Sequence, residues 1–314
     1  MAGLLPHVLI IAGPTASGKS GLALRVAEDL NGVVINADSM QVYSDLRVLT
    51  ARPSAADEAR VPHKLYGYLD GADACTAAAW AKDAATEIGS ALTANKLPII
   101  VGGTGLYLKA LTEGLADIPD IPAEVREAAR RMRIEDGNDT LYASLKDKDP
   151  EGAAKLKPKD RQRILRAWEV VEATGTPLHV WQQKAQAKPL IEARYTSVLF
   201  QPEREALYAS CDGRLEAMMD DGALDEVTAL VARDLDPALP VMKALGVPEL
   251  AAFLRGGCTR EEAVTKAQQH TRNYAKRQMT WFRGQFNASE TLNAQYSESI
   301  FNEIFPKIRQ NLLT

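Results

Sequence analysis

Continuous apolar runs alternate with amphipathic segments over the first third of the chain. The apolar runs have the length and character of buried strands, and they occupy Val8–Ala12, Val33–Asn36 and Pro98–Val101. The segments between and after them have helical periodicity, and they occupy Lys19–Leu30, Trp80–Ala94 and Leu106–Leu111. Strands that alternate with helices in this way predict an α/β domain with a parallel sheet.

The pattern becomes purely helical after a proline-rich joint at Asp117–Pro122. Helical periodicity continues from Ala123 to about Ala187, and a buried strand then returns at Tyr195–Phe200. The helical stretch is therefore interpreted as an insertion between strands of one sheet. We expect a first part of the core at 1–117, a helical insertion at 118–193, and the completion of the core with C-terminal helices at 194–314.

Several helices have recognisable ends. The clearest helix of the insertion is Asp160–Ala173, and Gly175 is placed to end it in the left-handed conformation. Thr259 followed by Glu262 is a capping box that begins a long last helix. The whole chain from residue 203 onwards is expected to be helical.

Composition excludes several classes of protein. The 314 residues are 46% hydrophobic and 25% charged, which excludes wholesale disorder. No apolar run approaches the roughly 18–20 residues that span a membrane, and the N-terminus lacks the basic region of a signal peptide. Three widely separated cysteines fit neither a disulfide framework nor a zinc site, so we expect free thiols in a cytoplasmic protein.

Positive charge is concentrated in three segments, although the formal net charge is −4. These segments are Arg126–Arg133, Lys155–Arg166 and Lys266–Arg283. One such run is usually a solvated helix face. Three of them in an acidic protein favour a surface that binds a phosphate backbone.

A glycine-rich loop follows the first predicted strand and precedes a predicted helix. It fits the pattern G-x-x-x-x-G-K-[ST], in which backbone N–H groups, a lysine and a helix N-terminus surround phosphate oxygens. The final serine of the pattern is placed to bind Mg²⁺. The loop comprises Gly13, Pro14, Thr15, Ala16, Ser17, Gly18, Lys19 and Ser20.

Two further polar residues follow predicted strands. Asp38 comes after the second strand and should face the crevice into which the phosphate loop opens, where a carboxylate can accept a proton from a nucleophile. Its alternative role is to cap a helix that starts at Ser39. Thr104 follows the third strand, at a place where hydrolytic P-loop proteins usually carry an aspartate. This difference favours a loop that holds phosphates while another group is transferred.

Five motifs together resemble the bacterial tRNA dimethylallyltransferases, also called isopentenyl-tRNA transferases. The resemblance extends from Val8 to about Arg283. The motifs are GPTASGKS at Gly13–Ser20, NADSMQVY at Asn36–Tyr43, VGGTGLYLKAL at Val101–Leu111, KDRQRILRAWEV at Lys159–Val170 and TRNYAKRQMTWFR at Thr271–Arg283. The first motif is common to many proteins, whereas the second, third and last, in this order, are highly specific.

The resemblance implies an α/β fold, a P-loop NTPase-like parallel sheet with an inserted all-helical tRNA-binding domain. It implies transfer of a dimethylallyl group from dimethylallyl diphosphate to the exocyclic amine of the adenosine 3′ of the tRNA anticodon. The reaction implied depends on Mg²⁺ and hydrolyses no nucleoside triphosphate. The partners implied are the tRNA anticodon stem-loop and the diphosphate, with no membrane or protein partner and a monomer as the default.

The resemblance also implies a role for each matching residue. Thr15–Ser20 hold the diphosphate, Asp38 is the general base, and Arg214 pairs with the diphosphate. Thr104 lies near the leaving oxygen and the base, and with Ser20 it is a candidate Mg²⁺ ligand. The residues implied to contact tRNA are Asp38, Ser39, Met40, Gln41, Thr104, Arg126, Gln162, Arg163, Ile164, Leu165, Arg166, Met242, Lys243, Ala244, Leu245, Gly246 and Val247.

Three positions depart from the family pattern. Arg52 stands where the family usually has lysine, Val247 where it often has tyrosine, and Ser210 where it often has arginine. Three other functions remain as alternatives. They are an adenylate prenyltransferase acting on a free nucleotide, a P-loop kinase that consumes ATP, and an RNA-binding protein with a vestigial phosphate loop.

Overall fold

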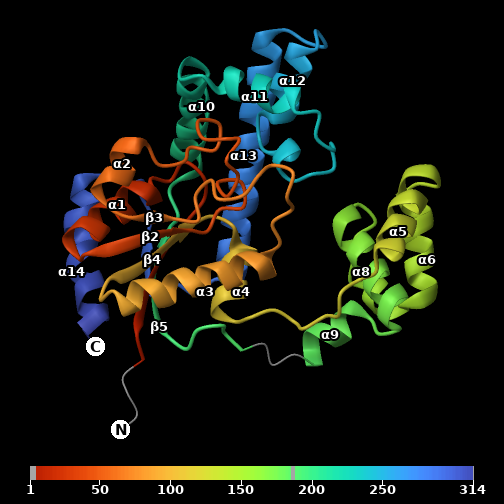
Figure 1. Ribbon diagram of the computed structural model, residues 1–314, viewed down its shortest axis with the longest axis horizontal. Helices are drawn as coiled ribbons and strands as arrows, with labels where there is room; N and C mark the ends of the chain where they lie inside the picture. Colours follow the sequence, from red (N-terminus) through yellow and green to blue (C-terminus); the bar gives the residue numbers. More distant parts are fainter. Residues whose placement is uncertain (1–4, 185–187, 314) are drawn as a thin grey trace. The chain divides into compact units, whose positions relative to one another are not determined.

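The computed structural model describes residues 5–184 and 188–313, and its centre is a six-stranded parallel sheet (Figure 1). The strand order is β3-β2-β4-β1-β5-β6, and every pair of neighbours runs parallel. The strands are β1 (His7–Ala12), β2 (Gly32–Asn36), β3 (His63–Lys64), β4 (Leu97–Gly102), β5 (Arg194–Phe200) and β6 (Glu290–Leu292). The predicted α/β class is confirmed.

Helices cover both faces of this sheet (Figure 1). The helices of residues 5–112 and 190–313 are α1 (Lys19–Asp29), α2 (Ala55–Arg60), α3 (Ala77–Thr93), α4 (Gly105–Thr112), α10 (Arg204–Asp220), α11 (Ala223–Ala232), α12 (Val247–Leu254), α13 (Arg260–Gln285) and α14 (Glu298–Leu313). Alternate residues of β1 explain the two layers, since side chains of a strand point to opposite faces. Val8 and Ile10 belong to the same buried cluster as residues of α3, α4 and α11–α13, whereas Leu9 and Ile11 belong to the cluster that includes α1 and α14.

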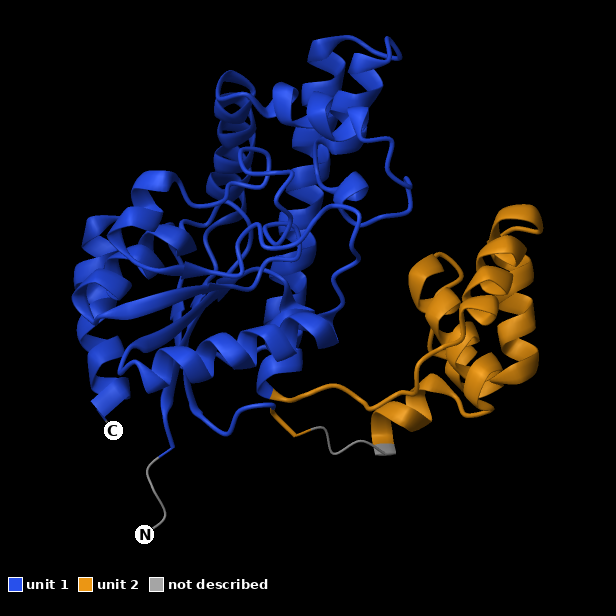
Figure 2. Ribbon diagram, viewed as in Figure 1, with its two compact units in different colours: residues 1–112, 190–314 blue, residues 113–189 orange. Residues whose placement is uncertain are grey.

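The chain folds into two compact units, residues 1–112 with 190–314 and residues 113–189 (Figure 2). The bounds expected for the helical insertion were 118 and 193, and the second unit begins and ends a few residues earlier. Ala187, where the predicted helical periodicity ends, lies outside the described residues.

The second unit has helices as the only regular secondary structure of its described residues, and it has a hydrophobic core of its own. Its helices are α5 (Ala123–Glu135), α6 (Asn138–Lys148), α7 (Pro150–Ala154), α8 (Arg161–Thr174) and α9 (Leu178–Lys184). Ile164, Trp168 and Leu145 are buried in that core. Gly175 ends α8 at φ 65°, in the left-handed region, as its position in the sequence predicts.

The expectation of an entirely helical chain after residue 203 is wrong, because β6 adds a sixth strand at the edge of the sheet. Only Leu292 of its three residues is buried, so no apolar run marks it. The two-residue strand β3 was missed for the same reason. The capping box that begins α13 is present, with Thr259 and Glu262 bonded to each other's backbone N–H groups.

None of the described helices is long and apolar enough to cross a membrane. The three cysteines are free thiols, as expected. Within the described ranges, no group of three or more His, Cys, Asp or Glu side chains is placed to hold a metal ion.

Candidate functional site

A pocket of about 240 Å³ opens beyond the carboxyl ends of the central strands, where Thr15 follows β1 and Asp38 follows β2. Helices α10 and α13 complete its lining with Arg214, Tyr274 and Arg277, among others. Because β1, β4 and β2 are neighbours in the sheet, the loops that follow them meet at this edge. The pocket therefore unites Thr15, Asp38 and Arg214, which are far apart in the sequence.

The glycine-rich loop begins directly after β1 and ends where α1 begins. Gly18 is the N-cap of α1 at φ 86°, a conformation that glycine adopts without strain. Lys19 lies just inside the helix, and its ammonium group donates to the Pro14 carbonyl at 3.2 Å. Ser17 is fully buried, and its hydroxyl has no hydrogen-bond partner among the described residues. The loop thus has the form required of a cradle for phosphate oxygens.

The charge of Lys19 is controlled by its surroundings. Burial lowers the pKa of Lys19 to about 8, against the attraction of Asp38, and the positive Arg214 lowers it further. Burial also lowers the pKa of the Arg214 guanidinium, which nevertheless stays protonated at neutral pH. Lys19 and Arg214 therefore bring two positive charges close to the glycine-rich loop, which favours an anion there.

Thr15 is held from two directions. Its backbone N–H donates to Gln278 Oε1 at 2.8 Å. Its hydroxyl accepts a hydrogen bond from Arg214, which comes from α10. Arg214 therefore lies against the glycine-rich loop, where the sequence analysis expected a partner for a diphosphate.

Asp38 lies in a tight turn after β2. Its backbone N–H donates to Asn36 Oδ1 at 2.8 Å, and its Oδ1 accepts the N–H of Met40 at 2.9 Å. No helix begins at Ser39, so the alternative role of Asp38 as a helix cap is wrong. Its second carboxylate oxygen accepts no hydrogen bond from the described residues and is available in the pocket.

Thr104 connects the loop after β4 to the loop that carries Asp38. Its Oγ1 accepts the N–H of Ser39 at 3.0 Å and lies 3.4 Å from the Ser39 hydroxyl. Gly102 allows the close approach, because a Cβ there would lie 2.1 Å from the Ala37 carbonyl oxygen. Tyr274 of α13 also lines the pocket, and burial raises its pKa far above the ordinary value, so its phenol stays neutral.

The residues predicted to contact tRNA fall into two sets. In the first unit, Lys243, Ala244 and Leu245 line the pocket together with Asp38, Ser39 and Met40. The side-chain amide of Gln41 instead donates hydrogen bonds to the carbonyls of Thr50 and Ala51, both at 2.9 Å.

The second set lies in the second unit. Arg126, Gln162 and Arg163 are exposed there, and Arg166 is partly exposed. Ile164 and Leu165 are buried in the core of the unit, so their side chains are not available to a nucleic acid. The family motif was transferred to a contiguous run, but a helical period of 3.6 turns two of its residues inward.

The three departures from the family pattern have local explanations. Arg52 donates to the Tyr43 carbonyl at 3.3 Å and packs against Gly67, where any Cβ would collide with it. The Ser210 hydroxyl accepts the amide of Gln295 at 2.7 Å. Val247 is buried at the start of α12, so no hydroxyl is missed at the surface.

Tyr274 and Gln278 are site residues that the sequence motifs did not predict. Both lie in the quoted motif TRNYAKRQMTWFR, where Thr271, Tyr274 and Gln278 follow one another at spacings of three and four. This spacing places them on one face of α13. The helical period of the motif was thus the signal that could have identified them.

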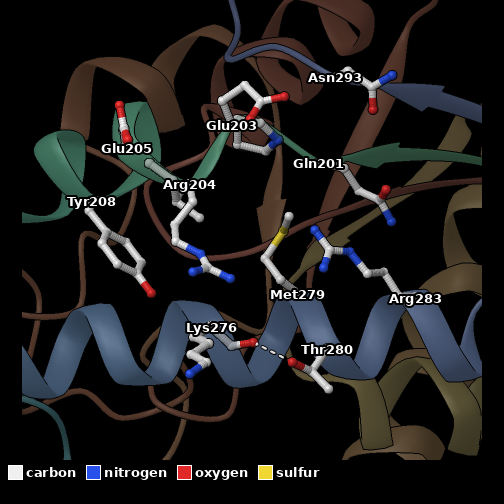
Figure 3. A pocket seen from close by; sticks show the side chains of 12 residues that line it. Gln201, Glu203, Arg204, Glu205, Tyr208, Lys276, Met279, Thr280, Arg283 and Asn293 are labelled. Atoms are coloured by element: carbon white, nitrogen blue, oxygen red, sulfur yellow. Dashed lines mark hydrogen bonds between the residues drawn. The ribbon is translucent and has the colours of Figure 1, made fainter.

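A second pocket, of about 670 Å³, lies between the start of α10 and the last turns of α13. Figure 3 shows the guanidinium groups of Arg204 and Arg283 pointing into the space above α13. Lys276 also lines this pocket. None of these three cations forms an ion pair with another residue that the structure describes. Glu203 and Glu205 line the same pocket, so its lining carries three positive and two negative side chains.

Comparison with known proteins gives a consistent result. A family model described as IPP transferase matches residues 41–285. A tRNA dimethylallyltransferase of Rhodospirillum centenum is 55% identical over 282 residues, which cover 90% of each chain.

Two solved structures are also similar over nearly all of this chain. The tRNA isopentenylpyrophosphate transferase of Bacillus halodurans is 30% identical, with a TM-score of 0.71, and 98% of this chain and 96% of that chain are covered. A eukaryotic dimethylallyltransferase acting on tRNA is 25% identical, with a TM-score of 0.80, and 98% of this chain and 80% of that chain are covered.

Proposed function

The chain belongs to the IPP transferase family, and we propose that it transfers a dimethylallyl group from dimethylallyl diphosphate to tRNA. The acceptor in this proposal is the exocyclic amine of the adenosine 3′ of the anticodon, and diphosphate is released. The observation that carries the proposal is the pocket that unites Thr15, Asp38 and Arg214. It combines an anion site with a carboxylate.

The donor diphosphate would occupy the glycine-rich loop. Lys19, Arg214 and the first N–H groups of α1 supply positive charge where negative charge develops as the allylic C–O bond breaks. The buried Ser17 hydroxyl, which lacks a protein partner, is free to bond a phosphate oxygen. These groups stabilise the leaving group more strongly in the transition state than in the bound substrate.

Mg²⁺ fits this site through Ser20. Ser20 is an exposed residue at the start of α1, and its hydroxyl makes no hydrogen bond to a described residue. Thr104 is a poorer ligand, because its oxygen is engaged by Ser39. Mg²⁺ commonly combines one protein ligand with substrate phosphates and water, and it would neutralise charge on the diphosphate.

Asp38 would act as the general base. A purine amine is a weak nucleophile because its lone pair is delocalised into the ring. The oxygen of Asp38 that is not bonded to Met40 can accept the amine proton as the new C–N bond forms. Lys243 and Leu245 line the same pocket and would contact the flipped nucleotide.

The anticodon stem-loop would bind basic surfaces in both units. Arg126, Arg163 and Arg166 provide such a surface in the second unit. In the first unit, Lys276 and Arg283 lie with Arg204 around the second pocket (Figure 3). These groups act mainly through phosphates, so tRNA binding should weaken as salt rises.

The experiment is transfer of radiolabel from dimethylallyl diphosphate, with unmodified tRNA and free AMP as separate acceptors and no ATP added. Label on tRNA alone supports the proposal. Label on AMP would indicate a prenyltransferase that acts on a free nucleotide. The exposed arginines of the second unit would then have no role in binding the acceptor. Absence of label together with ATP turnover would indicate a kinase.

A further inference from the structure

One loop of the pocket would bind the leaving group of the proposed reaction, and another is bonded to the turn that carries the base. The glycine-rich loop after β1 would hold the leaving diphosphate, and the loop after β4 carries Thr104, which is bonded to the Asp38 turn. The loops are in contact, since a Cβ on Gly103 would lie 2.8 Å from the Gly13 carbonyl oxygen. Their separation fixes where the leaving group lies relative to the base.

One buried side chain bridges these loops. Gln278 of α13 is 5% exposed. Its Oε1 accepts the Thr15 N–H at 2.8 Å, and its Nε2 donates to the Gly103 carbonyl at 2.9 Å. The two partners fix the orientation of the amide, because an N–H group must face the oxygen and a carbonyl must face the nitrogen.

We propose that Gln278 is a positioning residue that sets the distance and angle between the diphosphate and the base, so that the amine attacks the allylic carbon in line. This inference rests on the proposed function. Only a side chain with a donor and an acceptor at this length can hold both loops. Gln278 is bonded to Thr15 and Gly103 and acts through them, and Gly103 directly precedes Thr104.

The surrounding contacts explain why the bridge is rigid. The Thr15 hydroxyl is held by Arg214 while its N–H is held by Gln278, so the residue cannot rotate in the loop. One turn earlier on the same helix, Tyr274 lines the pocket together with Asp38. A single helix, α13, therefore supports the donor side and the acceptor side of the pocket.

The test compares two variants with a matched control. Gln278→Met keeps the length and removes both hydrogen bonds. Gln278→Glu keeps an acceptor for the Thr15 N–H and places a second acceptor against the Gly103 carbonyl. Gln268→Met is the control, because Gln268 lies on the same helix but bonds Glu216 at 3.1 Å, outside the pocket lining.

The expected result is a fall in kcat of about 10- to 100-fold for both Gln278 variants, the scale of a misalignment of about 1 Å. The KM for dimethylallyl diphosphate should change by less than about threefold, since the loop and its cations remain. Misalignment should also raise the ratio of dimethylallyl alcohol, formed when water takes the place of the amine, to label on tRNA. Gln268→Met should leave all three quantities unchanged.

Two results would overturn the inference. One is a kcat within about twofold of wild type in either variant. The other is a loss of kcat that only matches a loss of folded protein by thermal unfolding, with the alcohol ratio unchanged. Failure of the wild-type protein to label tRNA would instead refute the proposed function, so the two failures are distinguishable.

Discussion

The Oγ1 of Thr104 accepts the backbone N–H of Ser39 at 3.0 Å, so the loop after β4 is bonded to the turn that carries Asp38. Thr104→Val removes that acceptor and leaves a partly buried N–H unpaired, at a cost of about 1–3 kcal/mol. We expect kcat for tRNA prenylation to fall about tenfold or more, whereas Thr104→Ser, which keeps the hydroxyl, stays within about threefold. Equal rates in the two variants would show that this bond does not place Asp38.

Asp38→Asn tests the general base. The amide is nearly the same size, and its oxygen can still accept the Met40 N–H, so the turn should persist. Loss of proton acceptance should lower the single-turnover rate by about 10²- to 10⁴-fold. Binding of tRNA, measured by filter retention, should stay within about threefold. An unchanged rate would exclude Asp38 as the base.

Binding of the diphosphate should depend on pH through Lys19. The pKa of Lys19 in the fold is about 8, so its positive charge is lost as the pH rises through that value. The affinity for dimethylallyl diphosphate should therefore weaken above about pH 8, by up to about tenfold per pH unit from this group. Calorimetry in buffers of different ionisation enthalpy should detect proton uptake on binding at pH 9. The variant Lys19→Arg should show no such uptake, and uptake in that variant would assign the proton to another group.

The same shift has a consequence for stability. Because the folded pKa, about 8, lies below the ordinary value of 10.5, the unfolded chain binds more protons in the window between them. Through Lys19, the free energy of unfolding therefore rises as the pH goes from about 8 to 10.5. This gain is lost again as the pH falls back to 8. Urea unfolding measures the free energy of unfolding of wild type and of Lys19→Met at several pH values in this window. That free energy should rise more steeply with pH in wild type than in the variant.

Arg163, which is exposed, and Arg166, which is partly exposed, test the RNA-binding surface of α8. Arg163→Gln together with Arg166→Gln removes two positive charges and leaves Ile164 and Leu165 in the core. The affinity for tRNA should fall, and the slope of log K against log salt should become shallower by about 1.4–1.8. Arg309→Gln, an exposed change on α14, is the control. An unaltered salt slope in the double variant would remove α8 from the RNA surface.

The substitution Gly102→Ala tests whether β4 must lie close to the loop that carries Asp38. A Cβ at Gly102 would lie 2.1 Å from the Ala37 carbonyl oxygen, so Gly102→Ala must displace backbone. We expect a lower thermal midpoint and a lower kcat. Gly89→Ala is the matched control, because a Cβ at Gly89 in α3 meets nothing within 4 Å, and alanine should stabilise that helix by about 0.5–1 kcal/mol. Similar effects of the two changes would contradict the steric argument.

The sequence predicted those parts of the fold that depend on local periodicity. The apolar runs at β1, β2, β4 and β5 are strands, and Gly175 ends α8 as its position implied. The strand β6 escaped because an edge strand needs few apolar residues, and only Leu292 is buried. The local pattern of apolar residues predicts a strand poorly where the strand is held mainly by pairing with a segment far away in the sequence.

The charged residues of the candidate site could be predicted from the sequence, but the residues that hold its loops in place could not. Lys19 and Asp38 follow strands in recognisable motifs. Gln278 bonds Thr15 and Gly103 across 263 and 175 residues, so no local pattern reveals its partners. Ile164 and Leu165 are buried although they stand in the same motif as the exposed Gln162 and Arg163, because the helical period decides which of its residues face inward.

The order of strands in the sheet has a consequence for synthesis. Strand β1 pairs with β4 on one side and with β5 on the other. The first partner is complete by residue 102, but the second begins only at residue 194, after the entire helical unit. A nascent chain therefore presents β1, a central strand of the finished sheet, as an open apolar edge while about ninety residues are translated. Release of the chain before residue 194 would leave that edge without its partner, exposed to other nascent chains.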